Sequence, residues 1–236
     1  MVLVSNPFKF IFLKTSKTAG TTAEMVLEPA CAPEGHVVKE TVKTIISEVG
    51  IVGSRRSPLV APSQPALETG LWYHHKPAAE VLRDLGAERF NAYTKITTVR
   101  NPFDRCVSVF HWRKSGIAKR AQSFAALRSE FQNFIKSLDW KTDEPNVFVD
   151  GKFIINRAIR FEHLSQDLAD IFKTLGLPPR CAALPHTKST ADTRKSYAVA
   201  DYYDQTCIDI VRTRLSWVFD RFDYPNHPRF IQETRS

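Results

Sequence analysis

Residues 12–22 read FLKTSKTAGTT and lie close to the start of the chain. The β-rich run KFIFLK, Lys9–Lys14, leads into them and is expected to form the first strand. The segment TTAEMVL, Thr21–Leu27, follows the small residues Ala19 and Gly20 and is expected to form a helix. A strand, a small-residue turn and a helix in this order direct backbone N–H groups at an anion. The stretch therefore predicts an α/β fold with an anion site at the end of its first strand.

The order of residues in this loop differs from that of the usual nucleotide-triphosphate loop, which reads G-x-x-x-x-G-K-[ST]. Here Lys17 precedes Gly20, and two threonines follow the glycine. Small residues let a ligand approach the backbone closely. The groups expected to hold a phosphate or a sulfate ester are Lys17 and the backbone and hydroxyls of Thr18, Ala19, Gly20, Thr21 and Thr22. The alternative is a helix capped by threonine next to a solvated lysine.

A second anion site is predicted after the strand YTKITTV, Tyr93–Val99. Enzymes that use nucleotide triphosphates usually place an aspartate for magnesium at such a strand end, whereas this strand leads to Arg100. A helix is expected over Phe103–Trp112, so that Arg100 and Ser108 can face one phosphate. Two separate phosphate sites without a magnesium aspartate describe a nucleotide that is phosphorylated at two ends.

Strands and helices are expected to alternate along the rest of the chain. The expected elements are helices at 39–49, Pro77–Leu85, Ser123–Leu138, Ser165–Leu175 and Asp204–Phe219, a strand near Phe153–Phe161, and loops at 53–70 and 184–196. This alternation predicts a central, mainly parallel sheet with helices on both faces. The length predicts a single domain, residues 1–236, with a loop-rich segment at about 29–70.

The net charge of +8 and the pI near 9.4 favour an anionic ligand. The basic residues form no block of five or six, so a nucleic-acid partner is not expected. The four cysteines form no C-x-x-C pair, and neither a metal site nor a redox motif is expected. No apolar run of about 18 residues suggests a membrane span, and Lys9 and Lys14 interrupt the N-terminal apolar stretch, so a cytoplasmic protein without a signal peptide is expected.

Two motifs resemble those of sulfotransferases that use 3′-phosphoadenosine 5′-phosphosulfate (PAPS). The segment KTSKTAGTT, residues 14–22, resembles the 5′-phosphosulfate loop, and VRNPFDRCVSVFHW, residues 99–112, is similar to the 3′-phosphate motif. Further similar segments are HHKPAAEVLRDLG (74–86), RFEHLSQDLADIFKTLGL (160–177) and TRKSY (193–197). The order and spacing match from about residue 8 to 224, and the resemblance is to the group of carbohydrate sulfotransferases and short bacterial relatives. It implies a P-loop-like α/β core, a three-layer sandwich.

The chain departs from the family's usual motifs at three positions. Thr22 replaces a serine and keeps the hydroxyl, and Ala19 replaces a common glycine. Ser196 stands where an acidic residue often precedes the tyrosine. Residues 29–70 match nothing in the family firmly and are candidates for acceptor specificity.

The loop chemistry and the resemblance together imply how the 5′ end of PAPS is held. Lys17 is expected to stabilise the bridging oxygen and the leaving phosphate, while residues 18–22 hold the 5′-phosphate. Lys14 is expected to face the acceptor or the sulfate. The transferred sulfuryl group bears less charge than a phosphoryl group, so a lysine can serve where kinases need magnesium, and no metal is expected.

The second motif implies a site for the 3′-phosphate, which distinguishes PAPS from ATP. Arg100 and Ser108 are expected to hold this phosphate. The resemblance alone implies that Arg194 and Tyr197 close over it.

His75 matches the family's histidine and is the expected general base, since the pKa of histidine suits proton transfer near neutral pH. The alternative is that His75 only caps the Pro77 helix. The adjacent His74 should point the other way if the backbone is extended, so the two are not expected to bind a metal together. His111 and His186 are further candidates that no spacing supports.

The function expected is transfer of a sulfuryl group from PAPS to an acceptor hydroxyl of a carbohydrate or small molecule, leaving 3′-phosphoadenosine 5′-phosphate. One alternative is a small-molecule or nucleotide kinase, which needs ATP and magnesium. Another is a non-enzymatic protein that binds nucleotides or nucleic acid through a basic surface. The sequence leaves the acceptor and the oligomeric state open.

Overall fold

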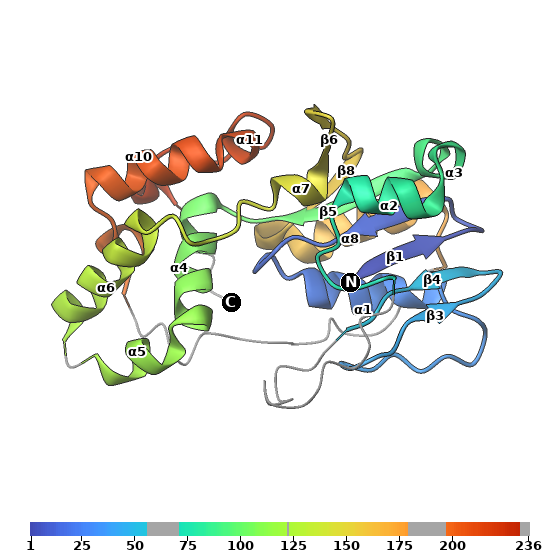
Figure 1. The fold of residues 1–236 in the computed structure, drawn as a ribbon, viewed down its shortest axis with the longest axis horizontal. Helices are drawn as coiled ribbons and strands as arrows, with labels where there is room; N and C mark the ends of the chain where they lie inside the picture. The colour runs from blue at the N-terminus through green and yellow to red at the C-terminus, as the bar shows by residue number, and fades with distance from the viewer. Residues whose placement is uncertain (56–70, 122, 179–196, 232–236) are drawn as a thin grey trace. The chain divides into compact units, whose positions relative to one another are not determined.

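The computed structural model describes residues 1–55, 71–121, 123–178 and 197–231 (Figure 1). The chain divides into two compact units. The first consists of Met1–Val99 and Asp143–Lys188, and the second of Arg100–Thr142 and Ser189–Ser236. The prediction of a single domain stays a prediction, and each unit is described by itself.

The first unit contains a six-stranded sheet in the order β3-β4-β1-β2-β5-β8. The strands are β1 (Val2–Ser5), β2 (Phe10–Leu13), β3 (Ile45–Ile46), β4 (Gly50–Val52), β5 (Thr94–Val99) and β8 (Arg157–Arg160). The pairs β2–β5 and β5–β8 are parallel, whereas β1 pairs antiparallel with β2 and β4, and β3 with β4. The predicted α/β class is confirmed. The sheet is mixed, because β1, β3 and β4 take part in antiparallel pairs. The sequence analysis did not anticipate these three strands.

Helices cover both faces of this sheet (Figure 1). Side chains alternate between the faces of a strand, so Phe12 in β2 packs with α1 (Gly20–Leu27) and α8 (Leu164–Leu175). Its neighbour Leu13 packs with α2 (Ala78–Leu85) and α3 (Ala87–Ala92) on the opposite face. This unit therefore has three layers, and the loop from β2 to α1 lies at the carboxyl end of a central strand.

A short segment completes the first unit after the second has intervened in the sequence. It contains α7 (Glu144–Val147) and a hairpin of β6 (Phe148–Val149) and β7 (Lys152–Phe153). The one-turn helices η1 (Glu28–Ala30) and η2 (Phe161–His163) flank α1 and α8.

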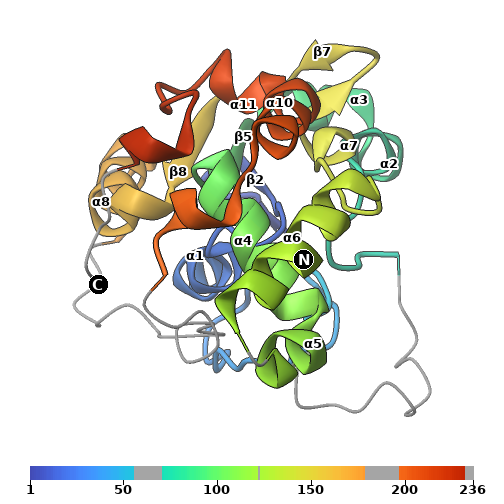
Figure 2. The ribbon, with the colours of Figure 1, turned by 90° about the vertical axis from the view of Figure 1, so that its left-hand side faces the viewer.

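The second unit is helical (Figure 2), and aromatic rings pack in its core. Its elements are α4 (Pro102–Arg113), α5 (Ser115–Arg120), α6 (Phe124–Lys136), η3 (Val199–Tyr202), α10 (Gln205–Arg214), α11 (Ser216–Phe219) and η4 (Pro228–Phe230). The ring of Phe131 lies edge-on to those of Phe110, Tyr202 and Tyr203, with centroids 4.9–5.5 Å apart. Leu127, Phe131, Phe134 and Ile135 are the buried residues of α6.

Two element predictions are wrong in detail. Residues 39–49 form no helix, because the β-branched pair Ile45–Ile46 joins the sheet as β3. The final helix is interrupted at Leu215, where α10 ends and α11 begins. Most of the loop predicted at 53–70 and all of that at 184–196 lie outside the described residues.

No helix among the described residues is long and apolar enough to cross a membrane. Cys31, Cys106 and Cys207 are buried free thiols. The fourth cysteine, Cys181, falls outside the described residues.

Candidate active site

The loop between β2 and α1 is held in a strained conformation. Lys17 and Ala19 have φ angles of 62° and 61°, in the left-handed region that side chains other than glycine rarely adopt. Such strain persists only where the surrounding structure over-determines it, and it is common at functional sites. Lys17 itself is partly exposed, as a ligand-binding lysine requires.

Hydrogen bonds to Thr98, in the neighbouring strand β5, fix the position of this loop. Thr98, in β5, accepts or donates a hydrogen bond of 2.7 Å to the hydroxyl of Thr18, and its carbonyl accepts one from Thr15. The hydroxyls of Thr15 and Thr18 are themselves 2.9 Å apart. The hydroxyl of Thr18 is therefore engaged within the protein, and its part in ligand binding stays a prediction.

Lys14 joins the end of β2 to α1 through a buried ion pair. Its Nζ lies 2.6 Å from Oε2 of Glu24 and donates a 2.9 Å hydrogen bond to Thr21 Oγ1. The second oxygen of Glu24 accepts from the α-amino group of Met1. Burial would raise the pKa of Glu24, but these two cations lower it to about 2. The charge of Lys14 is therefore balanced by the carboxylate of Glu24. A contact of Lys14 with the acceptor or the sulfate stays a prediction.

The N-terminus of α1 has no side-chain cap and no acidic residue in its first turn. By contrast, Asn101 caps α4 by accepting from the N–H groups of Phe103 and Asp104, and Asp204 caps α10. The alternative reading of a threonine-capped helix is therefore wrong, since Ala19 occupies the cap position of α1. The first N–H groups of a helix carry partial positive charge and bind anions.

His75 lies beside this loop with its ring in a defined orientation. Its Nδ1 is 3.1 Å from the carbonyl oxygen of Lys14. A carbonyl can only accept, so Nδ1 carries the hydrogen and Nε2 keeps its lone pair. Burial lowers the pKa of His75 to about 3, with the α-amino group of Met1 and Lys14 adding to the effect and Asp143 and Glu24 opposing it. The imidazole is therefore neutral at pH 7 and able to accept a proton.

The alternative role of His75 as a helix cap is wrong, and the extended backbone on which the direction of His74 depended is not found. His75 does not cap α2, because Pro77 holds the cap position without a side-chain hydrogen bond. The backbone at His75 is not extended, because its φ is 55°, and its ring meets that of His74 edge-on with centroids 5.7 Å apart. Within the described ranges, no three His, Cys, Asp or Glu side chains group as a metal site.

Three residues that sequence analysis missed hold this region together. The carboxylate of Asp143 accepts hydrogen bonds of 2.9 Å from the backbone N–H and the hydroxyl of Ser16. The amide of Asn146 donates a 3.0 Å hydrogen bond to the carbonyl of Lys76, next to His75. Thr98 is the only one of the three that carried a signal, as a polar residue near the end of a buried strand.

In the second unit, Arg100 lies two residues before α4 and Ser108 lies within it. The guanidinium of Arg100 lies 2.6 Å from the carboxylate of Asp104, and Ser108 follows one turn later. Ser108 is 1% exposed. That the two side chains face one ligand group stays a prediction.

The remaining predicted residues have other surroundings. Tyr197 stacks on Phe124 with ring centroids 4.0 Å apart. His111 is buried, with Nε2 3.0 Å from the hydroxyl of Tyr202, so it packs in the core of the second unit. Arg194 and His186 lie outside the described residues.

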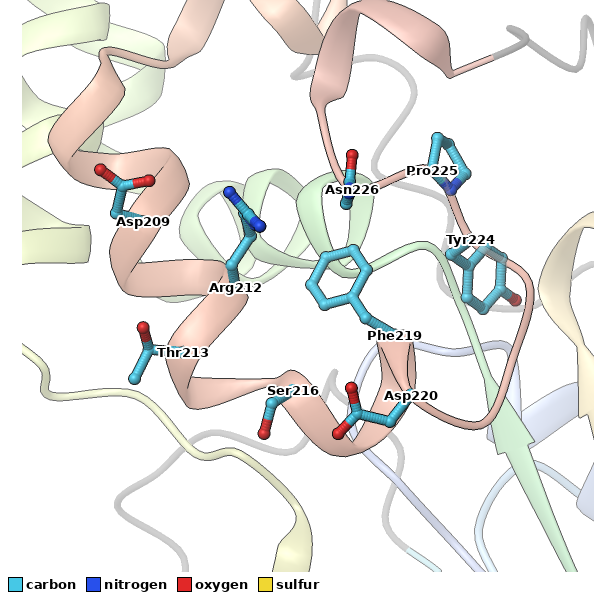
Figure 3. A pocket seen from close by; sticks show the side chains of 9 residues that line it. All are labelled: Asp209, Arg212, Thr213, Ser216, Phe219, Asp220, Tyr224, Pro225 and Asn226. Atoms are coloured by element: carbon cyan, nitrogen blue, oxygen red, sulfur yellow. The ribbon is translucent and has the colours of Figure 1, made fainter.

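A pocket of about 700 Å³ opens on the second unit, along α10 and α11 (Figure 3). Its lining is Asp209, Arg212, Thr213, Ser216, Phe219, Asp220, Tyr224, Pro225 and Asn226. None of the predicted site residues is among them, and carboxylates, a guanidinium and two aromatic rings together single out no class of ligand.

Replacing Gly20 with alanine is expected to disturb the loop. A Cβ there would lie 2.9 Å from Cγ of Lys14 and 3.3 Å from the hydroxyl of Thr98, both of which are held in place. We expect the free energy of unfolding to fall by about 1–3 kcal/mol, as overpacking usually costs, in urea denaturation. Gly116→Ala is the control, since its Cβ has only Arg120 side-chain atoms nearby, at 3.5 Å or more. Equal stability of the two variants would contradict the close packing around Gly20.

Comparison with known families gives one match. A model of the sulfotransferase family matches residues 1–225, which is nearly the whole chain. Searches of curated proteins and of solved structures found no match. The match confirms the family predicted from the two motifs and makes the chain an enzyme that transfers sulfuryl groups.

Proposed function

The chain belongs to the sulfotransferase family, and from this premise we propose that it transfers a sulfuryl group from PAPS to an acceptor hydroxyl. The observation that carries the proposal is the uncapped N-terminus of α1 next to Lys17. When bound, PAPS supplies an activated sulfuryl group on its 5′-phosphate. The strand, loop and helix that receive this end resemble a P-loop in their order.

Lys17 and the backbone of residues 18–22 hold the 5′ end in this proposal. The N–H groups at the start of α1 offer donors and partial positive charge to a phosphate. Lys17 adds a full positive charge next to the bridging oxygen, which becomes negative as its bond to sulfur breaks. Stabilisation of such developing charge by groups already in position is usually the largest contribution to the rate enhancement of an enzyme. Lys14 acts indirectly, since its ammonium is bound to Glu24 and Thr21 and so holds α1 in place.

Arg100 and Ser108 hold the 3′-phosphate in this proposal. A guanidinium suits a phosphate because it offers several donors in one plane. Asp104 keeps this guanidinium oriented along α4 through its 2.6 Å ion pair. We extend the 3′-phosphate site to Arg194 and Tyr197 on the motif resemblance alone.

His75 is the general base of the proposal. Its hydrogen bond to the carbonyl of Lys14 leaves Nε2 as the proton acceptor. A pKa of about 3 makes it a weak base in the free protein. Negative charge brought in by a bound nucleotide raises the pKa of a nearby imidazole, so the base strengthens when the donor is present.

The acceptor is a hydroxyl of a carbohydrate or small molecule, and residues 29–70 contribute to its selection.

Binding of 3′-phosphoadenosine 5′-phosphate is the first test. We expect calorimetry without magnesium to show tight binding of this bisphosphate and weak binding of ADP and ATP. Arg100→Ala should weaken bisphosphate binding at least about tenfold, the lower range for a charged hydrogen-bonded contact. Arg113→Ala is the control, because this arginine at the end of α4 pairs with Asp139 near the surface. Tighter binding of ATP with magnesium would overturn the PAPS assignment in favour of a kinase.

Lys17→Ala is expected to keep the fold and lose transfer activity. Removing one charge-stabilising group of this kind costs about 10²–10³ in kcat. The measurement is the rate of bisphosphate release with PAPS and an acceptor found by screening hydroxyl compounds. Lys173→Ala, an exposed lysine in the last turn of α8, is the control. Full turnover by Lys17→Ala would remove this lysine from the mechanism.

His75→Asn is designed to remove only the proton acceptor. Asparagine tolerates the left-handed φ of 55° and can still donate to Lys14, but it lacks Nε2. We expect bisphosphate binding to persist and kcat to fall about 10²–10⁴-fold, as for loss of a general base. His74→Asn is the matched control. Unchanged turnover in His75→Asn would assign the base elsewhere.

The same variant has an expected pH signature. The pKa of His75 is lower in the folded than in the unfolded protein, so the unfolded state binds the extra proton and stability falls as pH drops below about 6.5. Urea denaturation at pH 7 and pH 5 should show a smaller loss for His75→Asn than for the wild type. An equal loss in both would contradict the burial of a neutral imidazole.

A further inference from the structure

The turn that begins α7 reaches two parts of the candidate site. At its start, the carboxylate of Asp143 receives both the N–H and the hydroxyl of Ser16, the residue before Lys17. One turn later, the amide of Asn146 reaches the carbonyl of Lys76, the residue after His75. The turn itself is closed by a 3.0 Å hydrogen bond from the N–H of Asn146 to the carbonyl of Asp143.

The segment that receives Asn146 is itself rigidly held. Lys76 is 2% exposed, and its Nζ lies 2.6 Å from Asp84 and 4.9 Å from the ring centre of Tyr73. Its Nζ also donates to the carbonyl of Leu71 at 2.8 Å. A buried cation with this many partners does not shift easily, so Asn146 is attached to a firm support.

These contacts close a circuit. His75 donates a hydrogen bond to the carbonyl of Lys14, and Ser16, two residues further along the chain, donates to Asp143. Asn146, on the same turn as Asp143, donates to the carbonyl of Lys76, which is the neighbour of His75. Asp143 and Asn146 are 2% and 5% exposed, so water competes little for these bonds. The circuit therefore sets the position of the lysine loop relative to that of the histidine.

The circuit also accounts for the local strain. Lys17, His75 and Asp143 have φ angles of 62°, 55° and 62°, and none of them is glycine. Each such residue costs free energy and needs contacts that hold it there. The hydrogen bonds of Asp143 hold Asp143 itself and Ser16, which precedes Lys17. The hydrogen bond of Asn146 holds Lys76, which follows His75.

We propose that Asp143 and Asn146 are positioning residues that hold Lys17 and His75 in register for transfer. The proposal rests on the proposed function for the roles of Lys17 and His75. Neither Asp143 nor Asn146 touches the reacting groups in this account. Asp143 acts by positioning Lys17, and Asn146 acts by positioning His75. A displacement of about 1 Å in such an arrangement can cost about 10²-fold in rate.

The kinetic test is a pair of double-mutant cycles. Asp143→Asn and Asn146→Ala should each lower kcat by about 10–100-fold, with the KM for PAPS nearly unchanged and the protein still folded at the assay temperature. In the Lys17→Ala background, Asp143→Asn should have little further effect, and in the His75→Asn background the same should hold for Asn146→Ala. Glu144→Gln, an exposed acid on the same turn, is the control. Fully additive effects, or an equal loss in Glu144→Gln, would overturn the proposal.

A second measurement does not depend on activity. Amide hydrogen exchange should become faster at residues 15–20 in Asp143→Asn and at residues 74–77 in Asn146→Ala, with Glu144→Gln unchanged. Unchanged exchange at both segments would overturn the positioning role. If the wild type does not turn over PAPS, the proposed function fails, and exchange alone then decides whether α7 holds the two segments.

Discussion

The buried ion pair between Lys14 and Glu24 is the interaction on which the rest of the candidate site depends. Lys14 ends the strand that precedes the loop, and Glu24 lies in the helix that follows it, so the pair sets the angle between them. Gly20 packs against the aliphatic part of this lysine, and His75 binds its carbonyl. Breaking a buried pair leaves an uncompensated charge and commonly costs about 3–5 kcal/mol. One side chain therefore supports the loop, the helix start and the histidine together.

Several of the chain's 33 Lys and Arg residues are paired with carboxylates, which the net charge of +8 already takes into account. Lys14, Lys76 and Arg160 each face a carboxylate within 2.6–2.7 Å, those of Glu24, Asp84 and Asp167. Such pairs serve the fold and contribute little long-range attraction. The anion site is better explained by the direction of backbone N–H groups and by where Lys17 lies than by the overall charge.

Local patterns in the sequence predicted the parts of the site that lie close together along the chain. The strand, loop and helix around Lys17 follow from short-range spacing, and the motif around His75 from resemblance. Asp143 could not be found this way, because its partner Ser16 is 127 residues away and a T-D-E-P turn looks like an ordinary helix start. The helix predicted at 39–49 failed for a related reason, since pairing of Ile45 and Ile46 with β4 outweighs local spacing.

The first unit is built from two stretches of sequence, with residues 100–142 of the second unit between them. During synthesis, β2, the lysine loop and the histidine segment therefore emerge well before α7 and β8. The sheet cannot add its edge strand β8 to β5 until about 60 further residues have been made. Contacts of such high sequence separation form slowly, and the exposed edge of β5 is open to wrong pairing in the meantime. The geometry of the candidate site is thus among the last features that a growing chain acquires.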